Sequence, residues 1–320
     1  MENQPKFLML IYAIVAFIAV IGVILLVVDK APKRGREKVQ LVAFLTPALI
    51  LLTVGLVIPA IRTTVFSFKG PDGGSFIGLG NYQWMFTDSG SHRILLNTLL
   101  WVVLVPLVST SIGLLYAIVI DKARAESLAK ALVFMPMAIS FVGASIIWKL
   151  VYDYQGVGNQ IGLLNAIWVG LGGSPQRFLT NPPWNTLFLI VIMVWIQAGF
   201  AMVILSAAIK AISTDVVEAA RLDGVNARQM FRNVTLPSIR PAVIVVVTTI
   251  TIATLKVFDI VRTVTGGNFD TSVVANALYD QAFVFGDGGK GSALAVLLFV
   301  LVLPVVIYQV RVLRSQREIR

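Results

Sequence analysis

The sequence predicts an all-α, polytopic membrane protein with about seven transmembrane helices. Of its 320 residues, 57% are hydrophobic and only 13% are charged. Soluble domains carry about 25% charged residues, so lipid must replace water around much of this surface. Apolar runs also recur along the chain, each near the ~20 residues that cross a bilayer as a helix.

Seven apolar runs predict the spans. They cover residues 7–28, 41–66, 94–120, 129–151, 185–209, 239–258 and 291–312. The first run is too long for a signal-peptide core and has no A-x-A cleavage site, so it predicts a retained helix. Residues 272–285 predict a shorter helix that dips in from one side. Prolines at 47, 59, 106, 136 and 304 predict bends within or at the ends of spans.

The lysines and arginines predict the orientation. Alternate loops hold most of them, while the opposite set holds only six, namely Lys6, Lys69, Arg93, Arg177, Arg262 and Lys290. Basic loops stay in the cytoplasm, so the N-terminus is expected outside and the C-terminus inside. The net charge of +10 then reflects topology and lipid contact, not nucleic-acid binding. The chain has no cysteine and one histidine, His92, which excludes a disulfide framework and a metal site built from these residues.

A polar stretch, residues 213–237, lies between the fifth and sixth predicted spans. "STDVVEAARLDG" predicts a short helix that Ser213 or Asp215 caps and that Gly224 ends in the left-handed conformation. "NARQMFRNVTLP" predicts a second short helix that stops before Pro237. Its apolar Met230 and Phe231, next to arginines, indicate a docking surface. A plain connecting loop is the simpler interpretation, but such loops between packed helices have about 2–8 residues.

The same stretch carries the pattern E-A-A, three residues, G, nine residues, I, one residue, L-P, with Val234 in place of Ile. It resembles the EAA signature of ABC importer permeases. The resemblance implies a type I permease core of six helices plus one extra N-terminal helix. Residues 1–40 are then that helix with a basic linker, and residues 41–320 are the permease domain. It also implies a coupling loop that sits in a cleft of a cytoplasmic ATPase, with contacts at Glu218, Ala219, Ala220, Gly224, Met230, Phe231, Leu236 and Pro237.

Three further segments resemble the maltose-type sugar permeases, and within them the α-glucoside permeases. They are "FIGLGNYQWMF" (76–86), "LKVFDIVRTVTGG" (255–267) and "GSALAVLLFVLVLP" (291–304). Residues 266–269 depart from that family's glycine-rich turn ending in Pro, which bears on contacts with a binding protein. The resemblance implies a bacterial inner-membrane importer with a second, different permease, two ATPase subunits that bind ATP and Mg, and an extracytoplasmic sugar-binding protein. It implies no cofactor in this chain.

Residues within the fifth and sixth spans are candidates for the solute path. Gln197 and Phe200 share a helix face and pair a polar group with an aromatic ring, as sugars require. Thr248, Thr251 and Thr254 form a stripe that either lines the path or joins helices. Asp259 lies three residues after Lys256, so the two form either a functional site or a structural pair with a snorkelling lysine.

Other functions remain as alternatives at this point. The solute could instead be a compatible solute or a polyol phosphate. A membrane-embedded enzyme would need an acid/base pair or metal cluster in the spans, and Lys256 with Asp259 is a weak one. A passive channel leaves the docking loop unexplained. The segment "FGDGGKGS" (285–292) lacks the spacing of a phosphate-binding loop, so ATP hydrolysis is expected from a partner and not from this chain.

Overall fold

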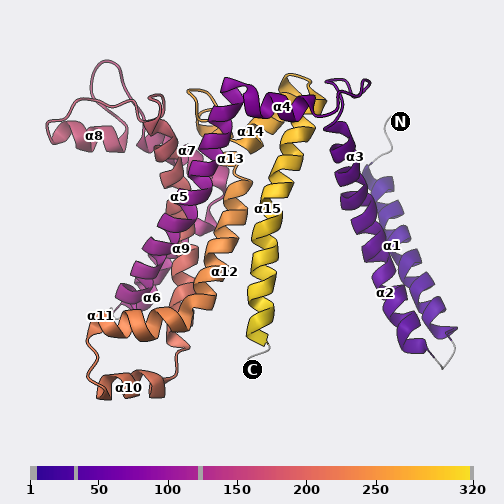
Figure 1. Ribbon diagram of the computed structural model, residues 1–320, viewed down its shortest axis with the longest axis horizontal. Helices are drawn as coiled ribbons and strands as arrows, with labels where there is room; N and C mark the ends of the chain where they lie inside the picture. The colour runs from indigo at the N-terminus through magenta and orange to yellow at the C-terminus, as the bar shows by residue number, and fades with distance from the viewer. Residues whose placement is uncertain (1–5, 32–34, 122–124, 318–320) are drawn as a thin grey trace. The chain divides into compact units, whose positions relative to one another are not determined.

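A computed structural model describes residues 6–31, 35–121 and 125–317 (Figure 1). The predicted position of the N-terminus falls on residues 1–5, outside this part of the chain. The described residues are almost wholly helical, and their only strand-like pairing is an isolated bridge between Lys69 and Phe76. The chain forms two compact units, Met1–Val65 and Phe66–Arg320. The boundary predicted from the sequence at residue 40 divides the extra N-terminal helix and its linker from the permease domain. It does not coincide with the division into compact units, and it stays a prediction.

The first unit is a pair of apolar helices. Helix α1 (Lys6–Asp29) packs against α2 (Arg36–Leu52), which continues through the π turn η1 (Thr53–Val57) into α3 (Ile58–Phe66). The π turn ends just before Pro59. Because proline has no N–H to donate, the wider turn lets the helix continue past it without a break.

The second unit holds the remaining helices. They are α4 (Gly80–Thr87), α5 (Ser89–Ile120), α6 (Glu126–Phe134), η2 (Met135–Ala138), α7 (Phe141–Val151), α8 (Leu163–Gly170), α9 (Trp184–Lys210), α10 (Thr214–Leu222), α11 (Ala227–Gln229), η3 (Met230–Thr235), α12 (Leu236–Leu255), α13 (Asp259–Val264), α14 (Val274–Tyr279), η4 (Asp280–Val284) and α15 (Gly288–Arg317). The short helix predicted over 272–285 corresponds to α14 and η4.

The predicted spans are confirmed except for the shape of the fourth. The described residues contain six helices that are long and apolar enough to cross a membrane: Phe7–Asp29, Arg36–Phe66, Ser89–Ile120, Trp184–Lys210, Ala227–Leu255 and Gly288–Val312. The span predicted over 129–151, with a bend expected at Pro136, is divided by a sharp bend of 102° between Glu126–Ala138 and Phe141–Val151.

The bend has a local cause. Pro136 lies in η2, where the chain tightens into a 3-10 turn, and Ile139 is extended. Ser140 then caps α7, since its Oγ accepts from the N–H of Gly143 at 3.1 Å. Thus Pro136 interrupts its helix as predicted, whereas Pro47, Pro106 and Pro304 lie inside helices that continue.

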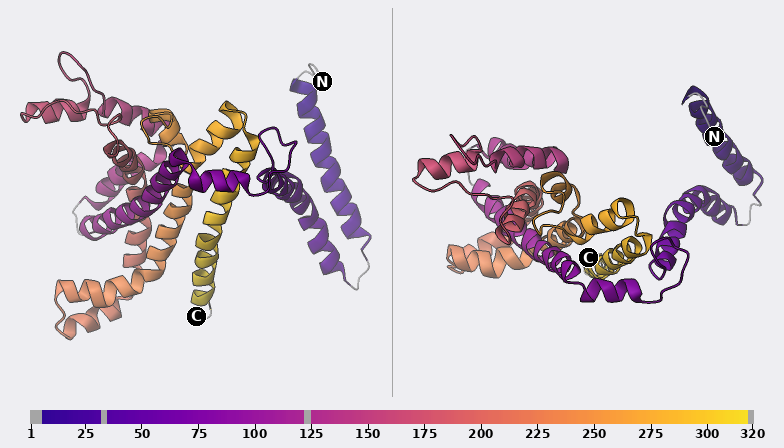
Figure 2. Two further views of the ribbon diagram at one scale, coloured as in Figure 1. Left: turned by 45° about the horizontal axis from the view of Figure 1, so that its top comes forward. Right: turned by 90° about the horizontal axis from the view of Figure 1, so that it is seen from above.

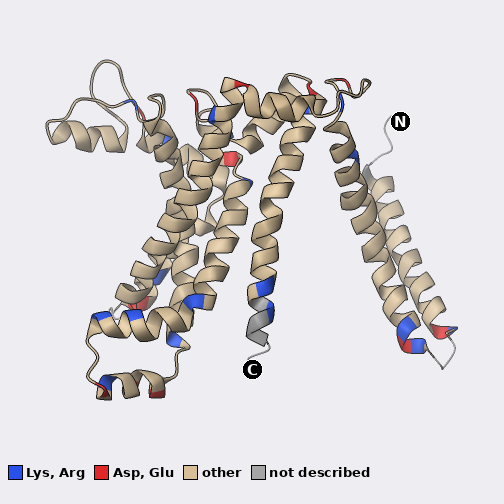
Figure 3. Cartoon of the chain, viewed as in Figure 1, with Lys and Arg blue, Asp and Glu red and all other residues tan. Residues whose placement is uncertain are grey.

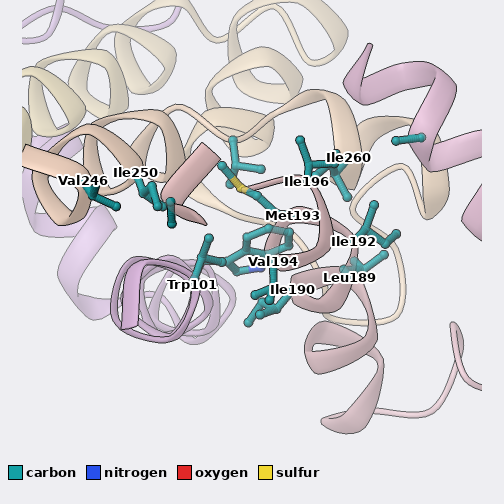
Figure 4. Packing of buried hydrophobic residues seen from close by; sticks show 14 of the residues in the cluster. Trp101, Leu189, Ile190, Ile192, Met193, Val194, Ile196, Val246, Ile250 and Ile260 are labelled. Atoms are coloured by element: carbon teal, nitrogen blue, oxygen red, sulfur yellow. The ribbon is translucent and has the colours of Figure 1, made fainter. Parts of the chain in front are cut away.

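Helices α5 and α9 pack face to face at the centre of the second unit, with α12 beside both (Figure 2). A Cβ at Gly113 of α5 would collide with Ala201 and come within 2.7 Å of the Met202 N atom. Only glycine permits this approach, as in other membrane helix pairs joined by small residues. Around the contact lie buried Trp101, Met193 and Ile250 (Figure 4).

The close approach at Gly113 predicts that a bulky residue at this position lowers the stability of the protein. We expect Gly113→Leu to destabilise the protein by about 1–3 kcal/mol, because the packed interface must open to admit the side chain. The measurement is the unfolding midpoint of the purified protein in detergent. Gly22→Leu in α1 is the matched control, since nothing lies within 4 Å of a Cβ there. Equal midpoints for the two variants would contradict this account of the interface.

Candidate functional site

The predicted docking stretch forms a loop at one end of the second unit, where α10 lies apart from the spans (Figure 1). Glu218 and Ala219 are exposed on α10, whereas Ala220 is buried. Of the two adjacent alanines, therefore, only Ala219 is accessible on the surface of α10. Basic residues gather at this end of the unit (Figure 3). Lys33, Arg34, Lys122, Arg124 and Arg320, also used to predict the orientation, lie outside the described residues.

Helix α10 ends at Gly224 as predicted. Gly224 has a φ of 74° and donates its N–H to the Arg221 O atom at 3.0 Å. Val225 donates to the Ala220 O atom at 3.3 Å. These two bonds form a Schellman motif, in which a left-handed residue closes the helix and turns the chain. At the other end Ser213 is the N-cap residue, but neither it nor Asp215 provides the predicted side-chain cap.

The second half of the loop differs from the prediction. Asn226 and Gln229 form a capping box: the Asn226 Oδ1 accepts from the Gln229 N–H at 3.0 Å, and the Gln229 Oε1 accepts from the Asn226 N–H at 2.8 Å. The helix that follows does not stop before Pro237. It passes through the π turn η3 and continues as α12, because proline is tolerated in the first turn of a helix.

Exposed apolar residues of the loop lie mainly on α10. Leu222 is 90% exposed and Val216 is 49% exposed. Met230 and Phe231, which the sequence indicated as the apolar docking residues, are half-buried, while Leu236 and Pro237 are exposed. Leu222 was missed by sequence reasoning, although its place two residues before the helix-ending glycine was a usable signal.

A cluster of charged residues holds the base of the loop. Lys130 of α6 lies 2.5 Å from the Asp121 Oδ1 and 2.8 Å from the Glu126 Oε1, and it also donates to Ser206. Ser206 donates to the Asp121 Oδ1 at 2.7 Å, and Lys210 pairs with Glu126. The cluster therefore joins the end of α5, the start of α6 and the end of α9, three residues before the loop begins.

The predicted solute-path residues of α9 and α12 lie within the packed helices. Gln197 is 8% exposed, and Phe200 is half-buried against the core. Thr248 and Thr251 donate to carbonyls of their own helix, Ile244 O and Val247 O, both at 2.8 Å. Thr254 does the same with Ile250 O at 2.7 Å. These hydroxyls satisfy their donors locally, so each keeps only acceptor capacity for another group.

The predicted pairing of Lys256 with Asp259 is wrong. Helix α12 ends at Leu255 and α13 starts at Asp259, so the two residues do not share a helix face. They form no ion pair within this described segment. Both instead line a cavity of about 30 Å³ beside Phe141 and Met193, close to the volume of one water molecule.

At the opposite end of the unit, three long-range contacts escaped the sequence analysis. Arg93 of α5 pairs with Asp270, and Asn97 donates to the Asp270 O atom at 2.6 Å. Asn185 of α9 donates to the Phe269 O atom at 2.7 Å. They join the turn after α13 to the ends of α5 and α9, across more than 80 residues of sequence.

The second unit is thus a bundle of helices long and apolar enough to span a membrane, with a structured polar loop between α9 and α12, an arrangement that fits a membrane transport subunit. The chain belongs to the family described as binding-protein-dependent transport system inner membrane component, whose model matches residues 109–318. It is therefore a multi-pass inner-membrane protein and a transport subunit, not an enzyme.

Named relatives lie in the same family. The alpha-glucoside transport system permease protein AglF of Rhizobium meliloti is 49% identical over 270 residues, which cover 84% of this chain and 80% of that protein. The osmoprotective compounds uptake permease protein GgtC of Synechocystis sp. is 47% identical over 278 residues, which cover 87% of this chain and all of that protein. The fold is that of a bacterial ABC transporter involved in the import of the acidic polysaccharide alginate, with a TM-score of 0.76, 24% identity, and coverage of 88% of this chain and 98% of that chain.

The charged cluster predicts the effect of removing its central cation. We expect Lys130→Met to destabilise the protein by about 1–3 kcal/mol, because the Asp121 carboxylate, 14% exposed, then loses its ionic partner. The measurement is the unfolding midpoint in detergent. Asp121→Asn combined with Lys130→Met removes both charges and should recover most of the loss. If the single variant unfolds like the unmodified protein, the cluster does not hold the base of the loop.

Proposed function

We propose that this chain is one of two permeases of an ATP-driven importer for a glycoside, and that the loop of residues 213–237 couples it to a cytoplasmic ATPase. The observation that carries the proposal is the form of the loop. It is ordered by its own Schellman motif and capping box, yet α10 leaves Leu222 90% exposed. A large apolar side chain held in water by a rigid support is a typical docking feature.

The remaining parts of the proposal follow from this role. The basic end of the second unit faces the cytoplasm under the positive-inside rule, and the C-terminus lies on that side. Two ATPase subunits bind ATP and Mg, so this chain needs no cofactor of its own. A different permease completes the path, and an extracytoplasmic binding protein delivers the solute. Gln197 and Phe200 contact the solute as it passes.

The choice of solute rests on the relatives. AglF is named for alpha-glucosides and GgtC for osmoprotective compounds, at nearly equal identity. A neutral glycoside fits the name of AglF, and it fits that of GgtC where the osmoprotective compound carries a sugar. Uptake into proteoliposomes that contain the complete complex and its binding protein decides the class. We expect transport of neutral glucosides; transport of polyol phosphates alone would refute this assignment.

The docking role of Leu222 gives a direct test of coupling. We expect Leu222→Asp to reduce co-purification of the ATPase at least tenfold, because the charged side chain cannot enter an apolar cleft without losing its hydration. The fold should survive, since the residue is exposed. Leu171→Asp is the matched control, because Leu171 is 79% exposed and directly follows α8, which lies at the end of the unit opposite α10 (Figure 1). Full ATPase recovery with Leu222→Asp would remove the loop as the coupling site.

The backbone of Gly224 supplies a second test. A Cβ at Gly224 meets nothing within 4 Å, so a substitution there acts through its φ of 74° alone. Valine resists this conformation by about 1 kcal/mol or more, whereas asparagine adopts it readily. We therefore expect Gly224→Val to weaken ATPase recovery and uptake, and Gly224→Asn to keep most of both. Glu218→Ala should weaken ATPase recovery less than Gly224→Val, since it keeps the helix. Similar results for valine and asparagine would show that the left-handed turn is not needed.

A further inference from the structure

The turn after α13 has an unusual backbone. Phe269 and Asp270, with φ of 55° and 61°, are the non-glycine residues of the described chain that adopt positive φ. Gly266 and Gly267 just before them are also positive, at 67° and 84°. The left-handed region costs a residue with a Cβ about 1 kcal/mol or more, and most of all a bulky one. Such strain persists only where the surroundings impose it, and it concentrates at ligand sites.

Side chains from two packed helices impose this strain. Asn185 of α9 is fully buried and donates to the Phe269 O atom at 2.7 Å. Asn97 of α5 donates to the Asp270 O atom at 2.6 Å and to the Ser272 O atom at 3.0 Å. Arg93 pairs with the Asp270 carboxylate. The turn is thus fixed from both helices, while the Phe269 ring remains 51% exposed.

A polar cavity of about 490 Å³ lies between this turn and the start of α5. Its volume is within the ~300–1,000 Å³ typical of small-molecule sites. Polar lining groups come from Ser89, Arg93, Asn97, Asn268 and Asp270, and Phe269 provides an aromatic face. The described bonds engage Arg93 only through Nη1 and Asp270 only through Oδ2. Hydrogen-bond donors on the guanidinium and an acceptor on the carboxylate therefore remain available to a ligand.

The charges of the cavity favour a neutral ligand. Arg93 and Asp270 cancel each other, and the other lining residues are uncharged. An anionic solute would meet the Asp270 carboxylate, and a cationic solute would meet the Arg93 guanidinium. Hydroxyl groups suit the site better, because each both donates and accepts a hydrogen bond. The apolar C–H face of a pyranose ring matches the Phe269 ring.

We infer that this cavity is a subsite for one pyranose ring of a neutral glycoside, separate from the predicted path residues Gln197 and Phe200. The inference rests on the proposed import of a glycoside, and it identifies the end of the bundle opposite α10 as the place where the permease itself first binds the solute. The Arg93–Asp270 pair binds hydroxyls, and the Phe269 ring packs against the sugar.

The test measures binding to the permease without the binding protein. The complete complex in nanodiscs free of maltoside detergent is titrated with maltose, and saturation-transfer difference NMR records contact with its ring protons. We expect transfer from the unmodified complex and a loss of at least fivefold with Phe269→Ala. Alanine keeps the Cβ and is less bulky, so the backbone strain does not increase and the ring is removed. Phe269→Trp should restore transfer, and Phe283→Ala, at a 73% exposed phenylalanine of η4, should leave it unchanged.

Several results would overturn the inference. They are the absence of transfer from the unmodified complex, equal transfer with Phe269→Ala, and preferential binding of glycerol 3-phosphate or glycine betaine over maltose. Phe269→Ala could also leave the transfer unchanged but raise the concentration of binding protein that half-maximally stimulates the ATPase. That result would make the turn a docking site for the binding protein instead. The NMR measurement needs no ATP hydrolysis. Failure of the coupling proposal, which co-purification of the ATPase measures, is therefore distinguishable from failure of the subsite, which the NMR transfer measures.

Discussion

The packing of α5 against α9 is the contact on which the rest of the second unit depends. It requires Gly113, because any side chain there would push the helices apart. Both helices extend to both ends of the unit. At one end they hold the Asp121–Lys130 cluster below the polar loop, and at the other they hold the Phe269–Asp270 turn through Asn97 and Asn185. One helix pair therefore fixes both polar regions in relation to each other.

Local patterns in the sequence predicted the features that depend on a few neighbouring residues. Apolar run lengths gave the spans, and the glycine after "EAARLD" gave the end of α10 with its positive φ. The prediction failed where one residue type is compatible with two local structures. Pro237 was expected to stop a helix, but it fits the first turn of α12, and the preceding π turn joins the two helical segments. Run length also could not reveal direction, so the sequence predicted a bend at Pro136 but not its size of 102°.

The contacts that were missed join residues far apart in the chain. Arg93 and Asp270 are separated by 177 positions, and Lys130 and Ser206 by 76. Their pairing depends on how the helices pack, which periodicity within one helix does not contain. The reverse error arose for Lys256 and Asp259, whose spacing fitted a helix pair although α12 ends between them. Spacing has meaning only within a continuous helix.

The order of the α10 loop has a consequence for the thermodynamics of assembly. A flexible segment loses conformational entropy when it binds, and this loss weakens the affinity. The two motifs at Gly224 and Asn226 fix the loop beforehand, so under the proposed coupling role a small surface around Leu222 would lose little of this entropy on binding. Backbone hydrogen bonds also join α10 to the chain that enters and leaves it. In the proposed coupling, a displacement applied to α10 would therefore be passed to the end of α9 and the start of α12.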